Sequence, residues 1–211
     1  GAGTGAIQMA GVAKILIALF TSPIIGFVAG YLLLKLILRL SWKASPRINS
    51  LFRRGQLVTA IALALSHGAN DAQKTMGIIT LALLTGGYLS EFVVPTWVIF
   101  ICALMIALGT SVGGWRLIHT IGKKFYRIRP IDGFTTQITS AVVILGASLV
   151  GGPVSTTQVV SSAVMGVGAG ERANRVRWGV AQEIAVAWLL TIPLTALVGA
   201  GMYWVLDLIF G

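Results

Sequence analysis

The most polar stretch of this chain lies inside one of its apolar segments. Residues 66–83 read SHGANDAQKTMGIITLAL, and apolar runs flank a middle that carries His67, Asn70, Asp71, Gln73 and Lys74. Ionisable groups at membrane depth are costly, and they persist mainly where they face a pathway or a partner. This cluster is therefore a candidate binding site for a polar solute or an ion.

Two interpretations of the cluster are open at the level of sequence. Gly68 permits a helix to break, and Asn70 or Asp71 would then cap a second half-helix that begins near Ala72. The free N–H groups and positive dipole end of such a half-helix suit an anion. In the simpler interpretation Asp71 and Lys74 form a neutral structural pair, which leaves the other polar side chains unexplained.

A second polar group follows two glycines and a proline. Residues 151–158 read GGPVSTTQ, and the hydroxyls of Ser155, Thr156 and Thr157 are donors that suit oxyanions without adding charge. Serine and threonine are also good helix N-caps, and both roles can hold at once.

The composition is that of a membrane protein. Hydrophobic residues make up 56% of the 211 residues, charged residues only 10%, and the mean hydropathy is +0.88. A soluble domain carries about 25% charged residues. Because about 20 apolar residues cross the hydrocarbon as a helix, we expect an all-α polytopic membrane protein. The lone Cys102 lies in an apolar run, so we expect a core residue rather than a disulfide or metal ligand.

The net charge of +10 is concentrated in three short loops, at residues 43–54, 116–129 and 172–177. Basic loops between apolar spans mark the cytoplasmic side of a bundle of membrane helices. Because membrane orientation accounts for this charge, the pattern argues against a nucleic-acid partner. With these loops in the cytoplasm, residues 8–40 run inward, 55–87 outward, 96–115 inward and 178–210 outward. The loop at 86–95 holds Glu91 and neither lysine nor arginine, as an external loop should.

Residues 131–170 do not fit this pattern of single crossings. Both ends adjoin basic loops, and the midpoint holds Gly151, Gly152 and Pro153 with no long or charged loop. We expect a re-entrant hairpin whose tip stops within the membrane, in preference to two full crossings. Such backbone is tolerated at membrane depth only where it lines protein or a wet cavity.

A short repeat supports this topology. The sequence Gly-Ala-Gly occurs at 1–3 and at 168–170, and each copy is followed by a Val-Ala pair and then by a proline, Pro23 or Pro193. The two copies open segments that run in opposite directions, which is typical of inverted-repeat transporters with a site near the midplane. We therefore expect one transmembrane domain over 1–211, in which 1–54 end the first repeat and 55–211 form the second.

Taken together, these blocks resemble the inorganic phosphate transporter (PiT) family. The resemblance is carried by GAND at 68–71 with its extension AQKT at 72–75, and by PVSTT at 153–157; Gly133-Phe134 and the glycine run at 166–170 match as well. It covers essentially the whole chain, as the second half of such a protein. GAND alone would be weak, but both blocks in this order are specific.

The resemblance implies a secondary transporter, not an enzyme, that imports inorganic phosphate with Na⁺ or H⁺ across the inner membrane of a prokaryote. It also implies that residues 1–6 end the hairpin of a first half that lies outside this sequence, and we expect a homo-oligomer. The anion site is then lined by Asn70, Asp71, Ser155, Thr156 and Thr157. Supporting or coupling-ion residues are expected among His67, Gln73, Lys74, Thr75, Gln137 and Gln158.

Two positions depart from the family pattern. Gln137 stands where many members have glutamate, and Gln158 where histidine is usual. Both changes remove a titratable group, which favours Na⁺ over H⁺ as the driving ion. Asp71 has two candidate roles: to hold Na⁺, or to accept a hydrogen bond from the proton of phosphate. We favour the cation role or a shared role, because carboxylates beside broken helices commonly serve ions.

Two rival functions remain. Sulfate has the same shape as phosphate, so a sulfate or other oxyanion permease is the nearest alternative. A membrane subunit that binds an anion without transporting it is the alternative from another class.

Overall fold

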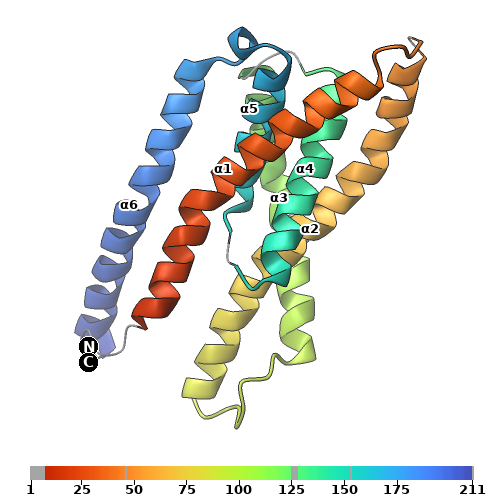
Figure 1. Ribbon diagram of the computed structural model, residues 1–211. Helices are drawn as coiled ribbons and strands as arrows, with labels where there is room; N and C mark the ends of the chain where they lie inside the picture. Colours follow the sequence, from red (N-terminus) through yellow and green to blue (C-terminus); the bar gives the residue numbers. More distant parts are fainter. Residues whose placement is uncertain (1–7, 46, 125–127, 153, 211) are drawn as a thin grey trace. The chain divides into compact units, whose positions relative to one another are not determined.

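The computed structural model describes residues 8–45, 47–124, 128–152 and 154–210, and this part of the chain is helical without strands (Figure 1). Residues 1–6 and Pro153, both used in the sequence interpretation, lie outside it. The helices are α1 (Met9–Leu40), α2 (Ile48–Thr85), α3 (Thr96–Lys124), α4 (Pro130–Leu149), α5 (Thr156–Glu171), the short 3₁₀ helix η2 (Ala173–Arg175) and α6 (Trp178–Phe210). The expected all-α fold class is confirmed.

The chain divides into two compact units, residues 1–176 and 177–211. The second unit is α6, a 33-residue helix that runs through Pro193 without ending. The first unit contains α1 to α5, and it holds every candidate site residue.

Within the described ranges, three helices are long and apolar enough to cross a membrane: Met9–Leu40, Thr96–Gly113 and Trp178–Ile209, with mean hydropathies of 2.1, 2.0 and 2.0. They correspond to three of the four expected crossings. The fourth, residues 55–87, lies in α2, which has 38 residues but carries the polar cluster in its middle. On α1, apolar side chains remain exposed on the face away from the bundle, among them Ile17, Phe20, Ile24 and Leu32.

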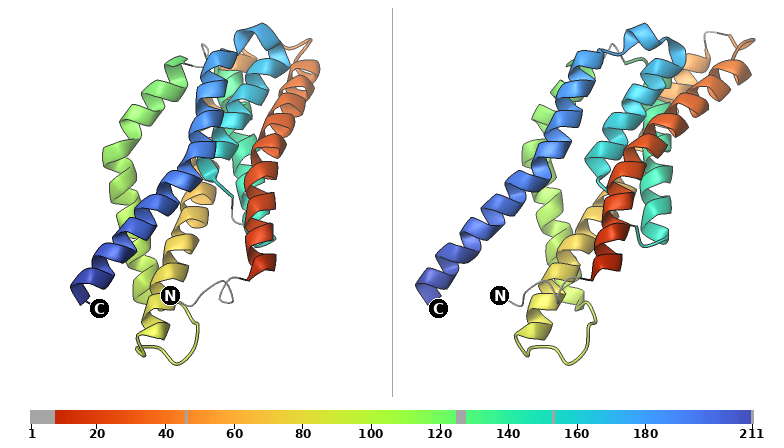
Figure 2. Two further views of the ribbon diagram at one scale, coloured as in Figure 1. Left: turned by 90° about the vertical axis from the view of Figure 1, so that its left-hand side faces the viewer. Right: turned by 60° about the vertical axis from the view of Figure 1, so that its left-hand side comes forward.

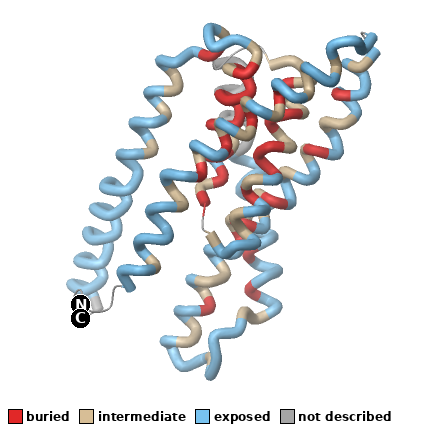
Figure 3. The backbone as a smooth tube through the Cα atoms, viewed as in Figure 1, coloured by how far each residue is buried: buried red, intermediate tan, exposed pale blue. Residues whose placement is uncertain are grey.

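Helix α5 is the buried centre of the first unit (Figure 3). Small residues allow α1 to cross it at close range. A Cβ added at Gly166 would lie 2.0 Å from the carbonyl oxygen of Phe27, and one at Gly26 would lie 2.5 Å from the hydroxyl of Ser162. The backbones therefore approach so closely that no larger residue fits, which is the packing that small residues favour between membrane helices.

Helix α4 packs against α2 through aromatic and amide groups. The rings of Phe52 and Phe134 lie 5.4 Å apart. The amide of Gln56 donates to the carbonyl of Pro130 at 3.1 Å, over Gly133, where an added Cβ would lie 2.1 Å from that amide. The Gly133-Phe134 pair in the family motif is thus a packing element between these two helices.

A tight turn joins α4 to α5, and the two helices lie side by side (Figure 2). Gly151 adopts a φ of +63°, its N–H donates to the carbonyl of Ser148, and the N–H of Gly152 donates to that of Ala147. This is a Schellman motif, in which glycine is the residue that tolerates the left-handed conformation. The turn lies beside the middle of α2 (Figure 1). That position supports a re-entrant hairpin, which stays a prediction, as does the inverted repeat.

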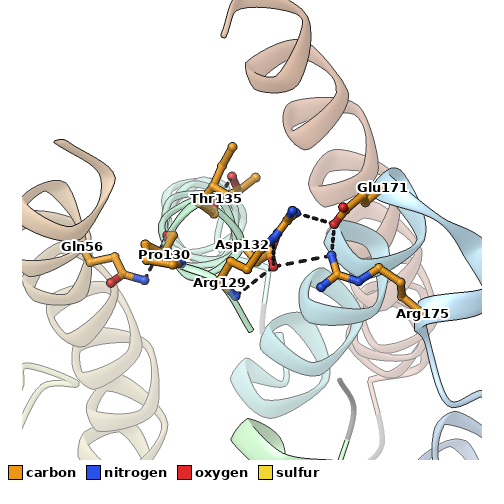
Figure 4. Close-up of polar contacts among 8 residues, drawn as sticks. Gln56, Arg129, Pro130, Asp132, Thr135, Glu171 and Arg175 are labelled. Atoms are coloured by element: carbon orange, nitrogen blue, oxygen red, sulfur yellow. Dashed lines mark hydrogen bonds and ion pairs between the residues drawn. The ribbon is translucent and has the colours of Figure 1, made fainter. Parts of the chain in front are cut away.

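A charged cluster connects the other ends of α4 and α5 (Figure 4). Asp132, 1% exposed, accepts the backbone N–H of Arg129 at 2.9 Å and the guanidinium of the same residue at 3.1 Å. Glu171 pairs with both Arg129 and Arg175, and Arg175 lies 3.8 Å from Asp132. These four side chains fix the open end of the hairpin.

The expected break in α2 is wrong. The helix runs without interruption from Ile48 to Thr85, and Gly68 meets no atom that would require the absence of a side chain. Asn70 and Asp71 bond to residues of α4 and α5 instead of capping a second half-helix. Because a continuous helix satisfies its own backbone groups, a single glycine costs only about 1 kcal/mol relative to alanine and does not break it.

Candidate functional site

An open pocket of about 280 Å³ lies where the middle of α2 meets the hairpin turn. Asn70, Gln73 and Lys74 line it from α2, and Ser148, Gly151 and Gly152 line it from the end of α4 and the turn. The polar cluster and the glycine turn, far apart in sequence, are therefore brought together.

Asn70 is the buried member of this lining, at 4% exposure. Its amide donates to the hydroxyl of Ser148 at 2.8 Å, which holds the side chain against α4. Its carbonyl oxygen has no hydrogen-bond partner within the described part of the chain. A buried amide oxygen without a partner is costly, and this oxygen is also closed to solvent, so Asn70 contributes to the site through its bond to Ser148.

Asp71 stands at the centre of a second set of contacts. One carboxylate oxygen lies 3.2 Å from the ring nitrogen Nε2 of His67 and accepts the hydroxyl of Thr156 at 3.2 Å. That hydroxyl is also 3.3 Å from the same ring nitrogen. The other carboxylate oxygen lies 3.3 Å from the ammonium of Lys74. Asp71 therefore joins α2 to the first turn of α5.

Lys74 makes the shortest polar contact of the site. Its ammonium donates to the carbonyl of Val154 at 2.7 Å. The side chain of Val154 is buried with Ile144 and Val159, which fixes that carbonyl between the two hairpin helices. The neutral pair of Asp71 and Lys74 expected in the simpler interpretation is present, but the hairpin turn takes part in it.

Ser155 is the N-cap of α5, and its hydroxyl accepts the backbone N–H of Gln158 at 3.5 Å. The capping role considered for this serine is confirmed. Helix α5 consequently begins at Thr156, which bonds Asp71 beside the pocket. The positive end that suits an anion is supplied by α5 rather than by a break in α2.

The other predicted site residues are more dispersed. Thr75 and Thr157 are exposed. Gln158 is buried, and its amide oxygen has no hydrogen-bond partner among the described residues. Gln137 accepts the hydroxyl of Thr59 at 2.6 Å, and it precedes Ser148 by eleven positions, roughly 16 Å along a helix. Gln137 is thus part of the α2–α4 contact and not of the pocket.

Three contributors to the site were not identified in the sequence. Ser148 holds Asn70, and the carbonyl of Val154 binds Lys74. Lys14 of α1 lies close to the turn, because a Cβ added at Gly151 would be 3.6 Å from its ammonium. A hydroxyl three residues before a glycine pair is the one signal that could have indicated Ser148.

Comparison with known proteins identifies the family to which this sequence belongs. The sequence matches the phosphate transporter family over residues 1–199. It is 46% identical over 99% of its length to a probable low-affinity inorganic phosphate transporter of Bacillus subtilis, and 44% identical over 98% to one of Rhizobium meliloti. The chain spans 63% of the length of each of these relatives.

A solved structure described as the sodium-dependent phosphate transporter shares the fold. Its TM-score is 0.83, at 22% sequence identity, over 99% of this chain and 70% of the other. Identity at this level supports the arrangement of helices and not the details of a site. The family match extends over nearly the whole chain, and this chain belongs to the phosphate transporter family, which comprises transporters and not enzymes.

Proposed function

We propose that this chain forms half of a secondary active transporter that imports inorganic phosphate across the inner membrane. The observation that carries this proposal is the pocket between the middle of α2 and the hairpin turn, in a member of a phosphate transporter family. A polar site beside the middle of a membrane helix is the arrangement that alternating access requires.

The residues that line the pocket and those beside it suit a partly protonated oxyanion. Lys74, with Lys14 near the turn, supplies positive charge, and the start of α5 adds a helix N-terminus. The hydroxyls of Ser155, Thr156 and Thr157 are candidate donors to phosphate oxygens. The carboxylate of Asp71, whose side chain is 35% exposed, is the candidate acceptor for a phosphate proton.

A carboxylate at this place favours phosphate over sulfate. Near neutral pH phosphate carries at least one proton, whereas sulfate carries none. A site built to accept a hydrogen bond rejects an analogue that lacks it, because its own polar groups are then left unpaired. Phosphate is therefore the proposed substrate, and a sulfate permease is the second candidate within transport.

Coupling to an ion gradient and assembly complete the proposal. The driving ion is Na⁺ or H⁺, and the protein that shares the fold is described as sodium-dependent. Residues 1–54 would end one repeat and 55–211 form the inverted second, with α4 and α5 as its re-entrant hairpin. The mirror-related groups would come from the other half of the full-length protein, which we expect to be a homo-oligomer.

Uptake of radiolabelled phosphate into proteoliposomes that contain the full-length protein tests this function. We expect uptake that depends on an imposed Na⁺ or H⁺ gradient, that arsenate inhibits and that excess sulfate leaves largely unchanged. Stronger inhibition by sulfate than by arsenate would favour the sulfate permease. Phosphate binding without uptake under any gradient would favour a non-transporting subunit.

A further inference from the structure

The ammonium of Lys74, on a side chain that is 43% exposed, contacts two oxygen atoms from different segments of the chain. It lies 2.7 Å from the carbonyl oxygen of Val154 and 3.3 Å from a carboxylate oxygen of Asp71. The second oxygen of that carboxylate accepts the hydroxyl of Thr156. A carboxylate and a backbone carbonyl at a turn are the ligands that transporters offer to Na⁺.

An ammonium and a sodium ion make the same demand on such oxygens. Lysine presents a compact single charge with three rotatable donors on a flexible stem, so it can satisfy several oxygens that would otherwise coordinate a metal ion. Here the stem comes from α2, and the carbonyl comes from the hairpin turn, held in place by the buried side chain of Val154. A free ion is therefore not needed to hold the turn against α2.

We propose that the ammonium of Lys74 is the resident cation of this half of the protein, and that it takes the place of Na⁺ beside Asp71. This inference deepens the proposed function and rests on it only for the role of the pocket. Because a tethered cation cannot travel with the substrate, any coupling ion must bind elsewhere in the full-length protein. Asp71 is then left to act on the anion and not on a transported cation.

Direct measurement of bound Na⁺ tests the proposal without requiring transport. The full-length protein, purified in detergent, is titrated with ²²Na⁺, and the number of ions bound per protein is determined for four variants. Lys74→Gln removes the charge and retains a polar side chain of similar length. We expect this variant to bind one more Na⁺ than the wild type.

If Lys74→Gln gains a Na⁺ ion, the carboxylate of Asp71 must be the group that binds it. The double variant Lys74→Gln with Asp71→Asn should return to the wild-type number, and Asp71→Asn alone should leave that number unchanged. Lys43→Gln is the matched control, because Lys43 is exposed in the turn after α1. It should bind as the wild type does.

Two results would overturn the proposal. One is an unchanged number of ions in Lys74→Gln, as expected if Asp71 and Lys74 are only a structural pair. The other is the loss of one ion in Asp71→Asn alone, as expected if Asp71 holds Na⁺ in the wild type. The second measurement decides the question even if Lys74→Gln does not fold. Neither result depends on phosphate uptake, so failure of the proposed function is recognised separately.

Discussion

The amide of Asn70 donates to the hydroxyl of Ser148 at 2.8 Å. This bond joins the middle of α2 to the last turn of α4, at the floor of the pocket that both residues line. It fixes a side chain whose carbonyl oxygen has no partner among the described residues. One wall of the pocket is thus held in place by a contact between two helices.

A double-mutant cycle on this pair should reveal direct coupling. We expect Asn70→Ala and Ser148→Ala each to lower stability, and the double variant to be destabilised by less than the sum. The coupling free energy should be about 0.5–1.5 kcal/mol, as for a single hydrogen bond. Thermal unfolding in detergent measures this coupling, with Ser111→Ala, at an exposed position of α3, as a control. Additive effects would show that the contact contributes nothing.

Asp71→Asn should change which anion is preferred. The variant keeps the size of the side chain and removes its charge, so it no longer repels sulfate and no longer offers a carboxylate to the phosphate proton. We expect the preference for phosphate over sulfate to fall severalfold, since the Asp71 side chain is 35% exposed and solvent reduces the cost of an unpaired partner there. Competition between the two anions in uptake assays measures this ratio. Wild-type uptake and selectivity would return Asp71 to a purely structural role.

Accessibility of the hairpin turn distinguishes a re-entrant hairpin from two full crossings. Gly152 lines the pocket and has a φ outside the left-handed region, and an added Cβ would approach the carbonyl of Ala147 only to 3.4 Å. In a Cys102→Ala background, Gly152→Cys should react with small hydrophilic thiol reagents, and phosphate should slow that reaction. Ser90→Cys, in the expected external loop, is the reference. Labelling of Gly152→Cys by bulky external reagents as fast as the reference would indicate two crossings.

The crossing of α1 and α5 should be intolerant of a single methyl group. Gly166→Ala would place its Cβ 2.0 Å from the carbonyl oxygen of Phe27, and overpacking of this kind costs about 1–3 kcal/mol. Gly146→Ala in α4 meets nothing within 4 Å and is the matched control. We expect a lower unfolding temperature for the first variant and an unchanged or higher one for the second. Equal effects would mean that helix propensity, not packing, governs both sites.

The charged cluster at the open end of the hairpin should depend on its buried member. Asp132→Asn removes the charge that faces Arg129 and Arg175 and weakens the cap of α4. We expect a loss of about 1–3 kcal/mol in the free energy of unfolding, the usual cost of leaving charged groups unpaired. Glu91→Gln, in an exposed loop, should have no measurable effect. Unchanged stability in Asp132→Asn would mean that the remaining pairs hold the hairpin alone.

The helices and their turn could be predicted from local sequence. Apolar length indicated α1, α3 and α6, and the glycines at 151 and 152 indicated the turn, because a left-handed residue in a Schellman motif is a local requirement. The two polar clusters near the pocket, at residues 67–74 and 155–158, could also be identified from their composition. These features depend on residues that are neighbours in the chain.

The errors concern contacts between distant segments. Gly68 predicted a broken helix, but Asn70 found its partner in Ser148, 78 positions away, and no break was needed. Ser148 had only its place three residues before the glycine pair to indicate it, and the carbonyl of Val154 could not be assigned to the site, since a backbone group carries no sequence signal of its own. Gln137 was assigned by resemblance to a supporting or coupling-ion role, which stays a prediction; its amide oxygen accepts the hydroxyl of Thr59 at the contact of α2 and α4.

The close crossing of α1 and α5 also sets the order in which this protein can assemble. The glycine face of α1, at Gly26 and Gly30, packs against α5, which is made about 130 residues later, or roughly 7 to 25 seconds later at ordinary rates of synthesis. Until then that face of α1 lacks the helix that it contacts in the finished unit. The centre of the first unit is therefore the last part to arrive, and insertion of the hairpin completes the unit instead of beginning it.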